Sequence, residues 1–379
     1  MSFKRIASVL AAILALTLGA GSAQAIDTGA RQAILVDYET GNVLYSKAAD
    51  EVMYPASMTK MMTIYMLFER LKNGSLSLED TFSVSEYAWR KGGSKMFVMV
   101  NDRVKVEELI RGIVVQSGND ATIVVAEGLA GSEEAFAEQM TLKARELGMS
   151  QTTYRNASGW PDPEQVTSAA DLATLAIATI RNFPDYYHYY SELSYTYNEI
   201  KQSNRNPLLY KDVGADGLKT GHTEASGYGL AASALRNGRR LVVVVNGYDS
   251  ERARAAGSER LLDWGFREFE NYALFKEGEK IVDAQVWLGE AKTVPAIVGR
   301  SLVMTIPRKA RPQMKATVRY DEPIPAPIAA GAQIGTVEIS APGIEPVTLP
   351  LLAGAEVMQL GPVGRLGEAL QHLVWGGGN

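Results

Sequence analysis

The sequence contains no cysteine and only three histidines, His188, His222 and His372. Without cysteine the fold has neither disulfides nor thiolate metal sites, and three scattered histidines are too few for a histidine-rich metal centre. We therefore expect no bound metal and no cofactor. The net charge is −5 and no long basic run occurs, which argues against nucleic acid as the main partner.

An N-terminal hydrophobic run long enough to cross a membrane is also missing. Residues 6–18 are apolar apart from Ser8 and Thr17, whereas a spanning helix needs about 20 residues. Lys4 and Arg5 precede this run and small residues follow it at positions 23 and 25. The pattern predicts a secretory signal peptide over residues 1–25, with an uncleaved anchor as the alternative. An exported protein without cysteine is ordinary in a bacterial envelope.

The composition is that of a globular protein, with 46% hydrophobic and 21% charged residues in a chain long enough for two domains. A predicted hairpin at residues 32–45 and a β-branched strand at 241–246 enclose a helical region. Strands at both ends with helices between them predict an α/β domain over residues 26–275, with an antiparallel sheet flanked by helices. The expected helices are 57–71, 106–113, 120–130, 132–147 and 167–183.

The composition changes near residue 275, where short strands separated by proline and glycine begin. We expect a small all-β sandwich domain over residues 276–358. Residues 359–379 form a separate segment, in which 363–375 has helical periodicity with one apolar face. We interpret this helix as an amphipathic anchor on a membrane surface. Packing on the β domain, or a role as an interaction tail, is the alternative.

The first candidate catalytic motif is Ser-Met-Thr-Lys at residues 57–60. Residues three apart on a helix share a face, so Ser57 and Lys60 would form a nucleophile and its base. Lysine acts as a base only when burial or a second cation lowers its pKa, and Lys219 is the obvious second cation. Such a motif alone is more often a capped helix with a surface lysine. Here the apolar residues that follow Lys60 place it beside the core.

The second motif is Ser117-Gly118-Asn119, in a short loop after a predicted helix. Ser117 would pass a proton between Lys60 and a leaving amine, while the side-chain amide of Asn119 matches a peptide backbone. The same three residue types are also common in ordinary turns, so this motif is weak when taken alone.

The third motif is Lys219-Thr220-Gly221, in a glycine-rich segment that fits an edge strand approached closely by a substrate backbone. Lys219 and Thr220 would bind a terminal carboxylate through charge-assisted hydrogen bonds. The backbone N–H groups of Ser57 and His222 would form an oxyanion hole. Taken alone, this motif also fits a solvated turn.

In this order and spacing, the motifs resemble those of the D-alanyl-D-alanine carboxypeptidases, the low-molecular-mass penicillin-binding proteins. The resemblance extends over essentially the whole mature chain, and Arg254 stands where the family has an arginine near its carboxylate pocket. The strings that carry it are VDYETGNVLYSK at 36–47, YPASMTK at 54–60, SGN at 117–119, NASGW at 156–160 and GLKTGHT at 217–223.

The resemblance implies a serine β-lactamase/transpeptidase-like catalytic domain and a serine-type D-Ala-D-Ala carboxypeptidase activity on peptidoglycan stem pentapeptides. Ser57 would attack the penultimate carbonyl, with Lys60 as general base and Ser117 as proton relay. His222 would act mainly through its backbone, with its side chain tuning Lys219. The implied substrate-binding residues are Asn119, Lys219, Thr220, Gly221, His222, Thr223 and Arg254.

The resemblance further implies covalent inhibition by β-lactams at Ser57, a periplasmic location and attachment to the outer face of the inner membrane through the C-terminal helix. Fast β-lactamase action is not expected, because Glu164 lacks the usual context of the glutamate that activates water in class A β-lactamases. Two alternatives stay open: a DD-endopeptidase that cuts crosslinks, and a catalytically idle wall-binding or morphology protein. The sequence leaves the oligomeric state open.

Overall fold

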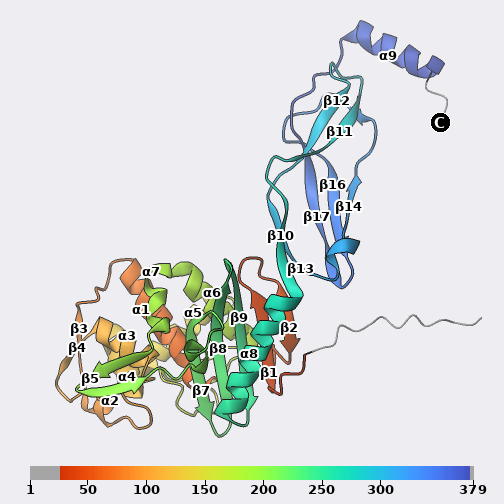
Figure 1. Cartoon of the computed structure of the whole chain (residues 1–379). Helices are drawn as coiled ribbons and strands as arrows, with labels where there is room; N and C mark the ends of the chain where they lie inside the picture. Colours follow the sequence, from red (N-terminus) through yellow and green to blue (C-terminus); the bar gives the residue numbers. More distant parts are fainter. Residues whose placement is uncertain (1–25, 376–379) are drawn as a thin grey trace, which may run out of the picture.

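The computed structural model describes residues 26–375, with the side chains up to Glu368. The signal peptide predicted for residues 1–25 lies outside the described residues. The molecule is elongated: a β-rich C-terminal domain extends from one end of the N-terminal domain, and a helix lies at its far tip (Figure 1). This helix is the last described element, so one end of the molecule is formed by the N-terminal domain and the other by the C-terminal end of the described chain (Figure 1).

A five-stranded antiparallel sheet forms the centre of the N-terminal domain. Its hairpin and its β-branched strand occur where the sequence predicted them, and the last strand, β7, lies at an edge. In spatial order the strands are β2 (Val43–Lys47), β1 (Gln32–Asp37), β9 (Arg239–Tyr248), β8 (Gly227–Arg236) and β7 (Ala215–Thr223).

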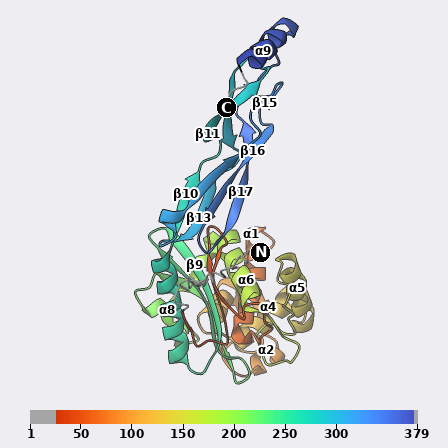
Figure 2. The same ribbon diagram turned by 90° about the vertical axis from the view of Figure 1, so that its right-hand side faces the viewer.

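The middle of strand β9, residues 241–245, is apolar without interruption because both faces of the sheet are covered there. Side chains alternate along a strand, so Val242 and Val244 belong to the larger core on the side of most helices. Val243 and Val245 belong to a second core, which also contains Leu261 of α8 (Glu251–Glu268). Figure 2 shows α8 on one side of β9 and α6 on the other.

The five helices expected from periodicity all form, and the first begins with a 3-10 turn, η1 (Ala56–Thr59). They are α1 (Lys60–Lys72), α3 (Val106–Val114), α4 (Asn119–Ala130), α5 (Glu133–Glu146) and α6 (Ala169–Asn182). Elements too short to show a period were not predicted. These are α2 (Glu86–Arg90), α7 (Pro184–Tyr187), η2 (His188–Ser191), η3 (Pro207–Tyr210) and two antiparallel strand pairs, β3 (Thr81–Ser83) with β4 (Arg103–Lys105) and β5 (Ser194–Tyr197) with β6 (Ile200–Ser203).

The C-terminal domain is all-β, as predicted, and has a hydrophobic core of its own. A two-stranded sheet pairs β10 (Phe269–Phe275) with β13 (Leu302–Pro307). The six-stranded sheet has the order β14 (Lys315–Arg319), β16 (Gln333–Ala341), β17 (Ile344–Ala353), β12 (Thr293–Val298), β11 (Lys280–Trp287) and β15 (Ile324–Pro325). A short 3-10 turn, η4 (Arg311–Gln313), precedes β14.

One segment assigned to the N-terminal domain differs from the prediction. Strand β10 lies before residue 276, yet it pairs with β13 of the C-terminal domain. Helix α8 ends at Glu268 and β10 begins at Phe269 with no intervening loop, so no run of glycine or proline marks the change in the sequence.

The junction of the two domains is built around the carboxylate of Asp37, at the end of β1. Asp37 is fully buried and accepts hydrogen bonds from Arg239 Nε at 2.8 Å and from Asn271 Nδ2 at 3.1 Å. Arg239 also donates to the backbone carbonyl of Phe269 at 2.6 Å. The hydroxyl groups of Thr40 and Thr305 lie 2.5 Å apart across the same junction. These bonds fix the first strand of the C-terminal domain to the central sheet.

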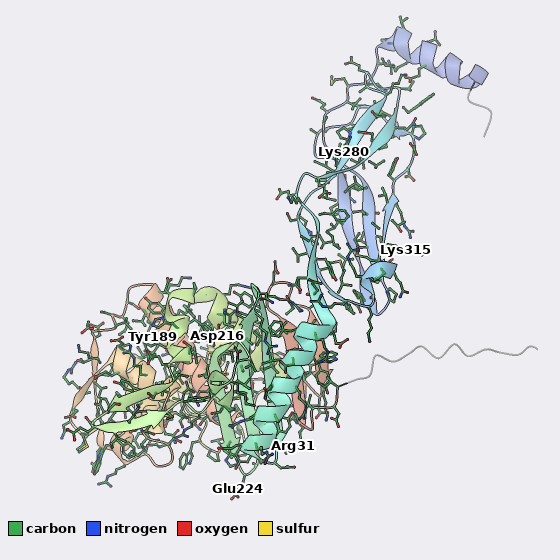
Figure 3. The ribbon with its side chains drawn as sticks, viewed as in Figure 1. Arg31, Tyr189, Asp216, Glu224, Lys280 and Lys315 are labelled. Carbon is green, nitrogen blue, oxygen red and sulfur yellow. The ribbon has the colours of Figure 1, made fainter. Side chains whose placement is uncertain are left out.

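We predict that Asp37→Ala destabilises the protein by about 3–5 kcal/mol, because it leaves the guanidinium of Arg239 buried without its carboxylate. Urea unfolding followed by circular dichroism measures this loss. Asp283→Ala is the matched control, since Asp283 pairs with Lys280 at the surface of the C-terminal domain (Figure 3). An exposed pair contributes about 0–1 kcal/mol, so equal losses in the two variants would refute a special role for the buried pair.

Candidate active site

Ser57 and Lys60 lie at the start of the first helix, as the motif predicted. Ser57 is in η1, and Lys60 is the first residue of α1. Their separation of one turn brings Lys60 Nζ to 3.0 Å from Ser57 Oγ. Lys60 is only 1% exposed, so the amine lies in the interior rather than at the surface. The alternative of a surface lysine on a capped helix is therefore wrong.

The amine of Lys60 has two further partners besides Ser57. It donates to Asn119 Oδ1 at 2.8 Å and to the backbone carbonyl of Ser158 at 2.5 Å. A neutral amine has two N–H groups and one lone pair. Because the oxygens of Asn119 and Ser158 have no proton to give, they occupy the two N–H groups and leave the lone pair for the hydroxyl proton of Ser57. The arrangement is that of a general base and its nucleophile.

Burial lowers the pKa of Lys60 from its ordinary value to about 7. The positive charges of Arg205 and Lys91 contribute to this lowering, while Asp120 and Glu133 act in the opposite direction. A large fraction of the amine is therefore neutral at neutral pH. The sequence predicted Lys219 as the second cation, but the cations that lower the pKa of Lys60 are Arg205 and Lys91, for which the sequence offered no signal. Lys60 instead lowers the pKa of Lys219.

The Ser117 loop joins α3 to α4 and turns sharply, with Ser117 at a φ of 59°. Ser117 is buried, and its Oγ has no hydrogen-bond partner among the described residues. A buried hydroxyl without a partner costs free energy. It is therefore available to a proton donor or acceptor that enters the site, as a relay requires.

Asn119 makes contacts within the protein that were not predicted from the sequence. Its Oδ1 accepts from Lys60, and its Nδ2 donates to the carbonyl of Gly92 at 2.9 Å. The side chain is thus held at both ends and fixes the lysine. One N–H of its amide is left for a substrate, so substrate binding by Asn119 stays a prediction.

Asp120, directly after the second motif, organises the neighbouring loop. Its buried carboxylate accepts from the backbone N–H groups of Met96 and Phe97, both at 2.8 Å, and from that of Val98 at 3.3 Å. The sequence analysis missed this role, although the position of Asp120 beside the motif was a usable signal.

The third motif lies on the edge strand β7, beside η1. Lys219 and Thr220 are both buried. A Cβ atom on Gly221 would lie 2.8 Å from the backbone oxygen of Pro55, closer than such atoms approach. The glycine was expected to admit a substrate backbone. It also has a structural role, because it lets β7 approach the segment that precedes Ser57.

Lys219 and Arg254 are two buried basic side chains of the site. Burial, together with the charges of Lys60, Arg205 and Arg254, holds the pKa of Lys219 well below its ordinary value. The Lys219 amine donates to the carbonyl of Thr220 at 3.1 Å. Arg254, on α8, is also buried, and its Nε has no hydrogen-bond partner among the described residues. A buried guanidinium without a counter-ion favours an anionic ligand, and an anion would also favour the protonated form of Lys219.

His222 and Thr223 continue β7 toward its turn. The imidazole of His222 is stacked on the ring of Tyr228, with the centroids 3.9 Å apart. Tuning of Lys219 by this ring stays a prediction. The backbone N–H of Thr223 and its hydroxyl both lie 2.9 Å from Ser226 Oγ, so Thr223 also closes the turn between β7 and β8.

A cavity of about 270 Å³ lies beside the nucleophile, between the segment before Ser57 and the loop that contains Trp160. Its surface is mainly apolar, and Asp162 is its one charged residue. The lining residues are Tyr54, Pro55, Ala56, Gly159, Trp160, Pro161, Asp162, Pro163, Gln165, Thr223 and Ala225.

The loop below the site holds no glutamate in contact with the nucleophile. The side chain of Glu164 is 71% exposed and pairs with Arg155 at 3.3 Å. The next residue, Gln165, is buried, and its Oε1 accepts from the backbone N–H groups of Arg155 and Asn156 at 2.8 Å. This loop is therefore stabilised by an amide and differs from the glutamate arrangement of class A β-lactamases, in agreement with the sequence.

Comparison with known proteins agrees with this geometry. Residues 20–250 match the family described as D-alanyl-D-alanine carboxypeptidase, and residues 269–359 match the C-terminal domain of penicillin-binding protein 5. The D-alanyl-D-alanine carboxypeptidase DacC of Escherichia coli is 38% identical over 351 residues, covering 90% of this chain and 88% of the relative. DacA of Haemophilus influenzae is 37% identical over 349 residues, covering 90% and 89%.

Solved structures give the same result. Penicillin-binding protein 5 of Haemophilus influenzae has a TM-score of 0.77 at 36% identity and covers 88% of this chain and 99% of its own. Penicillin-binding protein D2 of Listeria monocytogenes, solved with cefotaxime bound, has a TM-score of 0.58 at 29% identity, covering 64% and 98%. The chain with this buried serine–lysine pair therefore belongs to the D-alanyl-D-alanine carboxypeptidase family of serine peptidases.

Proposed function

We propose that this protein removes the terminal D-alanine from peptidoglycan stem pentapeptides through an acyl-enzyme on Ser57. The observation that carries the proposal is the bond between Ser57 Oγ and the amine of Lys60, whose pKa burial lowers to about 7. A buried amine whose pKa lies near 7 is suited to act as a general base at neutral pH. Membership of the D-alanyl-D-alanine carboxypeptidase family supports the choice of substrate.

In the acylation step, neutral Lys60 takes the hydroxyl proton of Ser57 as Oγ attacks the carbonyl carbon of the penultimate D-alanine. The developing oxyanion is bound by the backbone N–H groups of Ser57 and His222. When the C–N bond breaks, the proton held by Lys60 passes to the departing amine of D-alanine, with Ser117 as relay. The unpartnered, buried Oγ of Ser117 supports this role.

The terminal carboxylate of the substrate is bound by Lys219, Thr220 and Arg254. Lys219 and Arg254 supply positive charge from two different elements, β7 and α8, and both are buried. Such charge-assisted hydrogen bonds to a carboxylate are stronger than neutral ones. A carboxylate also relieves the repulsion among the cations of the site. The same pocket explains recognition of β-lactams, which carry a carboxylate beside a reactive amide.

Deacylation requires a water molecule and a base, and Lys60 is again neutral after the leaving group has taken its proton. The peptide segment on the acyl side lies along the cavity beside Trp160, which opens next to Ser57. With Glu164 directed away in an exposed ion pair, release of a bound β-lactam is slow. The Listeria relative, solved with cefotaxime and with ampicillin, supports β-lactams as ligands of this type of site.

The C-terminal helix α9 (Pro362–Trp375) attaches the exported protein to the surface of the inner membrane, from the periplasmic side. The helix forms as the sequence predicted, and Val363 and Leu366 are 86% and 65% exposed. On the same helix, Glu368 accepts a hydrogen bond from Lys292 of the C-terminal domain. This contact does not cover Val363 and Leu366, which stay available to a membrane surface. In the part of the chain that the structure describes, no helix is long and apolar enough to cross a membrane.

Ser57→Ala is expected to abolish D-alanine release from a peptide ending in D-Ala-D-Ala by at least about a thousandfold, because it removes the nucleophile. Intact-mass spectrometry after brief penicillin exposure, followed by peptide mapping, should find one adduct on Ser57 in the wild type and none in the variant. Parallel incubation with a crosslinked muropeptide dimer separates carboxypeptidase from endopeptidase activity. D-alanine release that persists in a folded Ser57→Ala protein would exclude the acyl-enzyme on this residue.

The acylation rate is predicted to rise with pH through a midpoint near 7 and then level off, because only the neutral amine of Lys60 accepts the proton. At pH 6, about one-tenth of the plateau rate is expected, since each pH unit below the pKa reduces the neutral form tenfold. Stopped-flow acylation with a fluorescent penicillin between pH 5 and 9 measures this limb. A rate that climbs tenfold per unit up to about pH 10 would assign Lys60 the ordinary pKa of an exposed lysine.

Arg254→Ala should lower kcat/KM by about 10–100-fold for a peptide with a free terminal carboxylate, the loss expected for one hydrogen bond to a charged group. The C-terminal amide of the same peptide should be a poor substrate for both proteins and lose little further activity. Arg252→Ala, an exposed position two residues away on α8, is the matched control. Equal losses on the acid and the amide would place the carboxylate elsewhere.

A further inference from the structure

Glu133 is a buried carboxylate that belongs to none of the three motifs. It is the first residue of α5 and is 4% exposed, whereas its neighbour Glu134, in the same turn, is exposed. Acidic residues favour the N-terminus of a helix, but this preference needs no burial. Ser132 already caps α5 by accepting from the backbone N–H of Ala135 at 3.1 Å. The burial of Glu133 therefore requires another explanation.

The contacts of Glu133 connect α5 to two neighbouring segments. Its Oε1 accepts from the backbone N–H of Ala157 at 3.1 Å, and its Oε2 accepts from the hydroxyl of Tyr87 at 2.9 Å. Lys91 Nζ lies 3.8 Å from Oε2. Both oxygens are thus engaged, by donors that suit an ionised carboxylate.

Ala157 stands directly before Ser158, whose carbonyl holds Lys60 at 2.5 Å. The carbonyl of Ala157 in turn accepts from Thr63 Oγ1 at 2.7 Å, and Thr63 lies one turn beyond Lys60 on α1. Glu133 therefore holds one side of this backbone segment while Thr63 holds the other. A segment fixed at both sides presents the Ser158 carbonyl to the amine in a single orientation.

The charge of Glu133 also acts on Lys60. The charges of Arg205 and Lys91 favour the neutral amine, whereas those of Asp120 and Glu133 favour the protonated form. The groups that face Glu133 itself are Tyr87 on α2, Lys91 directly after α2, Glu127 on α4 and Glu134 on α5. Burial raises the pKa of Tyr87 to about 12, so its hydroxyl keeps its proton throughout the pH range of the assay.

We propose that Glu133 is a positioning residue for the acylation step, which fixes the Ala157–Ser158 segment against Lys60 and places a negative charge near the amine. The inference rests on the proposed role of Lys60 as general base. Glu133 touches no reacting atom. It acts through the backbone of Ala157 and through its charge, and these two effects are separable by mutation.

The test compares three variants by the pH profile of acylation with a fluorescent penicillin. Glu133→Gln keeps an oxygen for the N–H of Ala157 but removes the charge. We expect a near-normal plateau, with the rising limb moved to lower pH by about half a unit, because Lys60 loses a negative neighbour. Glu133→Ala removes the bond as well, so its plateau should also fall, by about tenfold or more. Glu134→Gln removes the same charge from the same helix end and should leave both quantities unchanged.

The possible results separate this inference from the proposed function. Absence of acylation in the wild type would remove the proposed function itself. Suppose that the acylation rate of the wild type rises with a midpoint near pH 7 and that this midpoint is the same in Glu133→Gln. This result would overturn the charge effect alone. A folded Glu133→Ala protein with a normal plateau would overturn the positioning effect. If this variant fails to fold by circular dichroism, Glu133→Gln still tests the charge effect. An equal shift of the rising limb in Glu134→Gln would also overturn the charge effect, because the effect would then belong to the helix end rather than to Glu133.

Discussion

The structure depends on one buried amine. Lys60 lies in the interior, where a charged group is costly, and it is held by Ser57, Asn119 and Ser158. These partners come from three segments far apart in the sequence, so the amine is positioned only when η1, α4 and the 156–160 loop are packed together. Burial lowers the pKa of Lys60, and the partners fix its geometry. The same packing thus provides both conditions that a lysine base needs.

Packing of the edge strand adds the second constraint. Gly221 brings β7 against the segment before Ser57, and Lys219 on this strand lies close enough for the charge of Lys60 to lower its pKa. Arg254 adds positive charge from α8 on the other face of the sheet. A site of this kind is unfavourable when empty and becomes favourable with an anion. If the substrate carboxylate binds here as we propose, part of its binding free energy comes from relief of repulsion that the fold itself creates.

The motif residues were predictable because their chemistry is encoded locally. Ser57 and Lys60 are three residues apart on a helix, and their contact follows from helical geometry. Strand β9 was predictable from its unbroken run of β-branched residues. By contrast, Arg205 and Glu133 reach Lys60 only through tertiary packing, and nothing in their neighbouring sequence marks them. Strand β10 was assigned to the wrong segment because it continues directly from α8 without a turn signal.

The arrangement of the two domains limits where the substrate approaches. The turn between β7 and β8, marked by Glu224, lies at the end of the N-terminal domain away from the C-terminal domain (Figure 3). Helix α9 lies at the opposite extremity of the molecule (Figure 1). The bonds around Asp37 hold the first strand of the C-terminal domain to the sheet, so this separation is built into the packing. If α9 lies on the membrane as we propose, the carboxylate-binding strand is held away from the lipid surface, on the side where a wall polymer is found.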